Sequence, residues 1–126
     1  MKIVLLVCAA GVIGTLVRYF TVKVFNSVFP DFPWGTLAVN VLGAFIAGFA
    51  FVWCKSKFAE FEEYFPILFI GFLGAFTTFS SFALESIRFI ADGQYGKFVL
   101  NVTLQNFSGI GAAAGGFYLA KMFFKA

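Results

Sequence analysis

The sequence predicts an all-α membrane protein with four transmembrane helices, the third of which is broken. Hydrophobic residues make up 61% of the 126 positions and charged residues only 12%, and the mean hydropathy is +0.94. These values lie far from those of a soluble domain of this size. In addition, four apolar stretches alternate with short polar connections, and one stretch carries glycines and hydroxyls at its centre. Together these observations favour a helical bundle that has lipid as its main solvent.

The four apolar stretches fill the chain. A hydrocarbon core about 30 Å thick requires roughly 20 apolar residues in each spanning helix. The expected spans cover residues 3–20, 34–53, 65–90 and 98–124. A proline-bounded link, a charged link and a short turn connect them, so residues 1–126 are predicted to form a single transmembrane domain.

The basic residues give almost no orientation signal. An even number of spans places both termini and the second link on one side of the membrane. That side carries Lys2, Lys55, Lys57, Lys121 and Lys125, against Arg18, Lys23, Arg88 and Lys97 on the other, a division of five to four. Because an excess of Lys and Arg normally marks the cytoplasmic side, this near balance permits insertion in both orientations. One orientation set by a single loop is the alternative.

Small residues recur at helical spacing in three of the expected spans. They are Ala10 and Gly14, then Gly43, Ala47 and Gly48, and finally Ser108, Ala112 and Gly116. In a membrane such residues allow helix backbones to approach closely. They therefore predict packing faces and an oligomer.

Several classes of function are disfavoured by composition. The basic residues are scattered rather than clustered, which disfavours a nucleic-acid partner. The chain has no histidine, and Cys8 and Cys54 stand alone in apolar surroundings. No nucleophile is paired with a base and no nucleotide motif occurs, so an enzyme is not expected.

Two polar residues stand out in the first two spans. Arg18, near the expected end of the first span, either reaches the headgroups or attracts anions to a pore mouth. Asn40 shares a helix face with Gly43, Ala44 and Ala47 and should face protein. Its amide offers uncharged donors, either to a small anion or to a neighbouring helix.

The third span contains the most unusual run, GFLGAFTTFSSFALE from Gly71 to Glu85. Its hydroxyls are suited to satisfy backbone groups released where a membrane helix breaks; they are Thr77, Thr78, Ser80 and Ser81. A break is therefore expected within residues 74–81, and its freed carbonyls could coordinate a hard cation.

Aromatic rings alternate with the hydroxyls inside this run. The edges of Phe79 and Phe82 are electropositive, so the two rings could line an anion path, although they also fit a plain packing stripe. In the fourth span Asn101, Gln105 and Ser108 share a face, as a pore wall or as glue between subunits. An ion pair at i, i+3 accounts for Glu85 and Arg88.

The two motifs PWGTLAVN, from Pro33 to Asn40, and GFLGAFTTFSSFALE resemble those of the CrcB/Fluc fluoride channels, and an arginine near the end of the first span agrees. The resemblance covers essentially the whole chain. It implies an antiparallel, dual-topology homodimer in a bacterial plasma membrane, with two fluoride pores and a central structural sodium ion.

The resemblance also implies residue roles. Gly74 and Thr77 would offer backbone carbonyls to sodium, Phe79 and Phe82 would line the pore, and Asn40 would donate to fluoride. Further expected contacts are Thr36, Thr78, Ser80, Ser81, Arg18 and, on the fourth span, Gln105. Ala75 stands where many relatives have glycine, and Gly109 and Ala113 stand near expected hydroxyl positions.

The expected function is passive, fluoride-selective export that lowers cytoplasmic fluoride, without coupling to nucleotide or protons. Two alternatives stay open. A small multidrug-type, proton-coupled transporter would need a carboxylate in the membrane, for which Glu85 is the candidate. A membrane scaffold that transports nothing would use the rings and hydroxyls only for packing.

Overall fold

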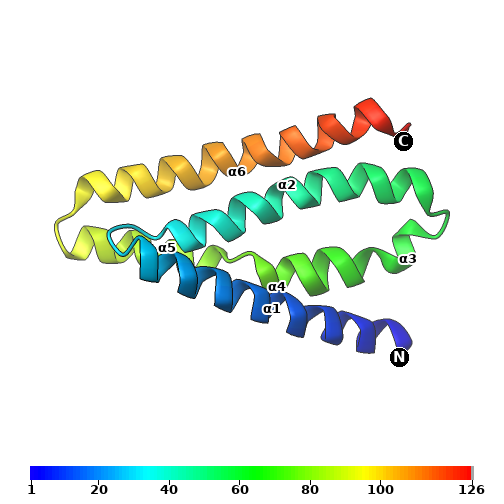
Figure 1. Ribbon diagram of the computed structural model, residues 1–126, viewed down its shortest axis with the longest axis horizontal. Helices are drawn as coiled ribbons and strands as arrows, with labels where there is room; N and C mark the ends of the chain where they lie inside the picture. Colours follow the sequence, from blue (N-terminus) through cyan, green and yellow to red (C-terminus); the bar gives the residue numbers. More distant parts are fainter. Residues whose placement is uncertain (126) are drawn as a thin grey trace.

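The computed structural model describes residues 1–125, which are helical with short connections and contain no strand. The elements are α1 (Lys2–Val28), α2 (Trp34–Lys57), α3 (Phe61–Phe65), the π-helix η1 (Pro66–Leu73), α4 (Gly74–Phe76), α5 (Phe79–Ala91) and α6 (Tyr95–Phe123). α1, α2, the interrupted run from α3 to α5, and α6 lie side by side as antiparallel rods (Figure 1). This arrangement confirms an all-helical class.

Both termini lie at one end of the bundle, together with the connection between α2 and α3 (Figure 1). The α1–α2 and α5–α6 connections lie at the opposite end. This is the arrangement predicted from an even number of passes, and it places the two nearly balanced groups of basic residues toward opposite ends.

Three stretches are long and apolar enough to cross a membrane: Lys2–Val28, Trp34–Lys57 and Phe61–Ala91, with hydropathies of 2.2, 2.1 and 1.9. α6 is also long, at 29 residues, but it contains amide, hydroxyl and glycine residues that lower its hydropathy. Large apolar side chains point outward along the rods, as expected where lipid rather than water surrounds the helices.

The first helix is longer than predicted. The sequence interpretation ended this span at residue 20, whereas α1 continues to Val28. The reason is that no glycine or proline occurs between Gly14 and Pro30, so nothing in the backbone ends the helix earlier. The other boundaries shift less: α2 ends at Lys57, and α6 covers Tyr95–Phe123.

Glycines bring α2 and α6 together. A Cβ atom on Gly48 would overlap the backbone carbonyl of Ala113, and one on Gly116 would overlap that of Phe45. Gly14 on α1 is similarly close to the carbonyl of Phe72. The predicted packing faces are therefore confirmed for these glycines, and they act within the subunit.

The third rod is broken at two residues. α4 ends at Phe76, and Thr77 and Thr78 are extended, with φ/ψ of −87°/158° and −149°/112°, before α5 begins at Phe79. The break lies inside the predicted range of 74–81. Thr78 caps α5, because its hydroxyl accepts a hydrogen bond from the backbone N–H of Ser81 at 3.2 Å.

Candidate functional site

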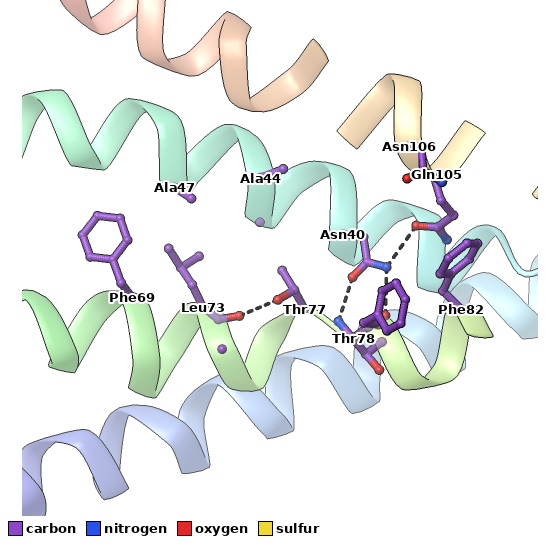
Figure 2. A pocket seen from close by; sticks show the side chains of 13 residues that line it. Asn40, Ala44, Ala47, Phe69, Leu73, Thr77, Thr78, Phe82, Gln105 and Asn106 are labelled. Carbon is purple, nitrogen blue, oxygen red and sulfur yellow. Dashed lines mark hydrogen bonds between the residues drawn. The ribbon is translucent and has the colours of Figure 1, made fainter. Parts of the chain in front are cut away.

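Asn40 of α2 joins the break to α6. Its Oδ1 accepts a hydrogen bond from the backbone N–H of Thr78 at 2.7 Å, and its Nδ2 donates to the Thr78 carbonyl at 3.0 Å. The same Nδ2 donates to Oε1 of Gln105 at 3.0 Å (Figure 2). One amide side chain thus connects three segments of the bundle.

The two hydrogen bonds between Asn40 and Thr78 change the hydrogen bonding of the broken helix. In a continuous α-helix the N–H of Thr78 would donate to the carbonyl of Gly74, but here it donates to Asn40. The preceding turn is still closed, because both the backbone N–H and the hydroxyl of Thr77 donate to the Leu73 carbonyl, at 3.0 and 2.8 Å. The Gly74 carbonyl is therefore released from its usual helical donor.

Three of the four hydroxyls predicted at the break lie together on its α5 side, whereas that of Thr77 bonds back to Leu73. The buried Thr78 hydroxyl donates to Oγ of Ser81 at 3.0 Å and lies 3.4 Å from Oγ of Ser80. This cluster supplies side-chain oxygens to the first turn of α5, as predicted for a broken membrane helix.

A cavity of about 440 Å³ opens beside the break. Its lining combines amide, hydroxyl and aromatic groups with small side chains: Asn40, Gly43, Ala44, Ala47, Phe69, Leu73, Gly74, Thr77, Thr78, Phe79, Phe82, Gln105 and Asn106. We call it the break cavity. The rings of Phe79 and Phe82 lie edge to face, with centroids 5.6 Å apart and an interplanar angle of 66°. Because Phe79 is 78% exposed, its ring can turn toward this space.

A second cavity, of about 410 Å³, lies between α1, α2 and α5 and is called here the basic cavity. Its lining contains Arg18, Lys23, Thr36, Ser81 and Glu85. Thr78 lines both cavities. The expected site residues are therefore divided between two spaces that meet at the break. Ser80 lines neither and is exposed.

Arg18 lies elsewhere than the sequence interpretation placed it. Because α1 runs to Val28, Arg18 is inside the helix and not near its end. It is half-buried, and its guanidinium donates to the carbonyl of Thr77 at 3.4 Å. It thus contacts the break itself rather than reaching the headgroups.

Sequence reasoning missed the role of Glu85. The Thr36 hydroxyl donates to its Oε1 at 2.6 Å, across 49 residues of sequence, and its other oxygen is buried without a hydrogen-bond partner. The ion pair expected with Arg88 is not formed, because α5 turns this carboxylate toward α2. Thr36 lies in the first motif and Glu85 at the end of the second, but nothing in the spacing of the two motifs predicts that these residues meet.

The hydrogen bond of Asn101 to α5 was also not predicted from the sequence. This fully buried residue of α6 donates to the hydroxyl of Ser86 at 3.1 Å, and Ser86 donates to the Phe82 carbonyl at 2.7 Å. The pair ties α6 to α5 next to an expected pore ring. The predicted face is thus occupied by Asn101 and Gln105, whereas Ser108 bonds to the Leu104 carbonyl of its own helix.

Fold and site together define a small helical membrane protein whose broken helix presents uncharged donors in a cavity. A model of the family described as CrcB-like protein, Camphor Resistance (CrcB), matches residues 5–117. The chain belongs to this CrcB family.

Curated relatives support this assignment over nearly the full length. A protein of Desulforapulum autotrophicum is 40% identical over 119 residues, covering 92% of this chain and 94% of its own. Proteins of Legionella pneumophila and Campylobacter jejuni are 40% and 41% identical, each over 93% of this chain and over 88% and 96% of their own lengths. All three are named fluoride-specific ion channel FluC, which is a channel and not an enzyme.

Proposed function

We propose that this chain forms a fluoride-selective channel through which fluoride leaves a bacterial cell passively, so that its cytoplasmic concentration falls. The observation that carries the proposal is the break cavity, where Phe79 and Phe82 lie with the amides of Asn40 and Gln105 and the hydroxyl of Thr78. Full-length similarity to channels named for fluoride supports the same conclusion.

The chemistry of this lining suits a small, strongly hydrated anion. Ring edges, amide N–H groups and hydroxyls can each replace part of a water shell. The residues that line the break cavity, all within the described chain, are uncharged. An anion therefore finds donors there but no fixed cation that would hold it tightly and slow its exit.

The basic cavity supplies an approach to this path. Arg18 and Lys23 line it and attract anions, and Thr78 separates it from the break cavity. We propose that fluoride enters by the basic cavity, passes the hydroxyls of Thr78 and Ser81 and then reaches the rings. Thr36, which lines the basic cavity, is a further contact on this route, and Ser80 acts indirectly, because its hydroxyl lies 3.4 Å from that of Thr78. Flow follows the electrochemical gradient without nucleotide or proton coupling.

The proposed functional unit is an antiparallel homodimer, with four spans in each subunit and two pores, in the bacterial plasma membrane. The break cavity opens at the surface of the subunit, where Gly74 and Asn106 are exposed. Polar groups facing hydrocarbon at this depth are unfavourable, and a second copy would cover them. The near balance of basic residues supports dual topology.

A central sodium ion is a further part of the proposal. The residues fit it in one respect, because the Gly74 carbonyl has lost the Thr78 N–H that would otherwise occupy it. The Thr77 carbonyl points out of the helix, and it accepts only a long hydrogen bond, from the guanidinium of Arg18 at 3.4 Å. Two carbonyls are too few for a hard cation, so a second copy would have to supply the same pair. A bound sodium ion would neutralise these carbonyl dipoles and fix the two halves of the broken helix.

The test is fluoride efflux from liposomes containing the purified protein, measured with a fluoride electrode and with chloride as the control ion. Rapid release of fluoride but not of chloride is expected. Export that requires a proton gradient and disappears in Glu85→Gln would instead indicate a proton-coupled transporter. No release from folded protein would contradict the channel and leave a scaffold.

A further inference from the structure

We infer that Arg18 sets how tightly the break holds a cation. Its guanidinium competes with the cation for the Thr77 carbonyl, and Glu85 is the acceptor to which Arg18 moves when the cation displaces it. This inference rests on the cation at the Gly74 and Thr77 carbonyls, which is part of the proposed function. It gives Arg18 a role toward that cation, in addition to its attraction of anions in the basic cavity.

The hold of Arg18 on the break is weak. Its guanidinium donates to the Thr77 carbonyl at 3.4 Å, which is longer than the usual distance of such a bond. Among the described residues this is the one hydrogen bond that the guanidinium makes. Because an arginine carries several N–H donors, most of them are left for another acceptor. The contact with Thr77 can therefore be exchanged at little cost.

Arg18 and the cation share one oxygen atom. The Thr77 carbonyl is one of the two that would hold the cation, and the released carbonyl of Gly74 is the other. A hard cation binds a carbonyl oxygen at about 2.4 Å, so on Thr77 it would lie within about 6 Å of the guanidinium nitrogen. Two positive charges this close inside a protein repel strongly enough to change an affinity by about tenfold or more. Each cation therefore weakens the binding of the other.

A second acceptor for Arg18 lies in the basic cavity. Oε1 of Glu85 accepts from the Thr36 hydroxyl at 2.6 Å, but Oε2 is buried and has no hydrogen-bond partner among residues 1–125. Arg18 and Glu85 both line this cavity of about 410 Å³. A buried oxygen without a partner is unfavourable, and hydrogen bonds between arginine and a carboxylate are among the strong ones. A guanidinium displaced from Thr77 thus finds a better acceptor in the same space.

Lys23 provides the contrast to Arg18. It also lines the basic cavity, but its ammonium lies over the ring of Tyr19, 5.8 Å from the ring centroid, and it forms no hydrogen bond with the described part of the break. Removing Lys23 takes the same charge from the same cavity without freeing the Thr77 carbonyl. It is therefore the matched control for a role that depends on contact with the break.

The test measures the thermal unfolding midpoint in detergent while sodium chloride replaces N-methyl-D-glucamine chloride at constant ionic strength. Because a ligand of the native state stabilises it by mass action, the sodium concentration at which the midpoint begins to rise reports the sodium affinity. Arg18→Gln should lower this concentration by about tenfold, and Lys23→Gln should leave it unchanged. An unchanged concentration in Arg18→Gln, or an equal shift in Lys23→Gln, overturns the inference.

Glu85→Gln tests the second acceptor and decides the question if Arg18→Gln does not fold. Without the carboxylate the displaced Arg18 loses its partner, so sodium should bind more weakly, and unchanged sodium binding overturns the exchange. In the double variant Arg18→Gln/Glu85→Gln, removing the carboxylate should have no further effect, because Glu85 acts through Arg18. Equal weakening with and without Arg18 would assign the effect to the charge of Glu85 itself and also overturn the exchange.

Fluoride efflux from liposomes separates a failure of this inference from a failure of the proposed channel. If the wild type releases fluoride but neither it nor Arg18→Gln responds to sodium, the cation and this inference are both contradicted and the channel is not. If the wild type responds to sodium but releases no fluoride, the channel is contradicted, and the shift in Arg18→Gln still decides the competition.

Discussion

Asn40 binds both backbone polar groups of Thr78, accepting from its N–H at 2.7 Å and donating to its carbonyl at 3.0 Å. A side chain from α2 thereby supplies hydrogen-bond partners for the backbone N–H and carbonyl of the residue at which the third rod is broken. Inside a membrane, where water cannot take over these bonds, the break depends on this partner.

Replacing Asn40 by leucine should destabilise the protein strongly. The substitution leaves the N–H and carbonyl of Thr78 without partners, and roughly 2 to 4 kcal/mol of stability should be lost. The measurement is the thermal unfolding midpoint in detergent. Asn106→Leu is the control, since this exposed amide bonds only to its own helix. Equal midpoints for the two variants would contradict a clamping role.

Phe79→Ile and Phe82→Ile should each slow fluoride efflux by about tenfold, because an aliphatic side chain has no electropositive edge to offer an anion. Efflux from liposomes is the measurement. Phe107→Ile is a matched control, because Phe107 on α6 is 78% exposed, as Phe79 is, but lies outside the break cavity. Wild-type rates in both ring variants would return the two phenylalanines to a packing role.

Gly48→Ala should lower stability by roughly 1 to 3 kcal/mol, because its methyl group would overlap the Ala113 carbonyl and push α2 and α6 apart. The comparison is with Gly111→Ala on α6, where a Cβ meets nothing within 4 Å. Thermal midpoints of the two variants should differ clearly. If both match the wild type, the close approach of α2 and α6 at Gly48 is not what limits stability.

Thr36→Val should cost roughly 1 to 3 kcal/mol, since it removes the hydrogen bond to Glu85 and leaves a partly buried carboxyl without either partner. Thr36→Ser keeps the hydroxyl and should stay close to wild type. Unfolding midpoints of the pair give the answer. A serine variant as unstable as the valine variant would assign the effect to the lost methyl group and not to the bond.

Replacing sodium by the bulky cation N-methyl-D-glucamine should lower the unfolding midpoint if sodium holds the break, because a ligand that binds only the native state stabilises it by mass action. Titration with sodium chloride should restore the midpoint with saturation. A midpoint that follows ionic strength alone, whatever the cation, would remove the sodium ion from the proposal.

Much of the fold could be predicted from local sequence. The apolar stretches predicted the rods, and the dense hydroxyls after Gly74 predicted a break within residues 74–81, which the structure places at Thr77 and Thr78. The end of α1 was wrong by eight residues, since residue 20 had been expected and Val28 is observed. Arg18 was misplaced for the same reason, because its depth depends on where the helix ends.

The candidate site was only partly predictable. Asn40, Phe79, Phe82 and Gln105 were identified and line the same cavity. The bond between Thr36 and Glu85 and the link from Asn101 through Ser86 to Phe82 were missed, because each depends on how neighbouring helices are turned against one another.

The sequence by itself determined that this chain is helical, lies in a membrane and breaks its third rod beside two aromatic rings, because hydropathy and backbone chemistry are local properties. Only the tertiary structure decided how the polar groups pair. The nitrogen of Asn40 is fully used and that of Gln105 is not, and this difference arises because a hydrogen bond depends on the distance and direction between atoms on separate helices.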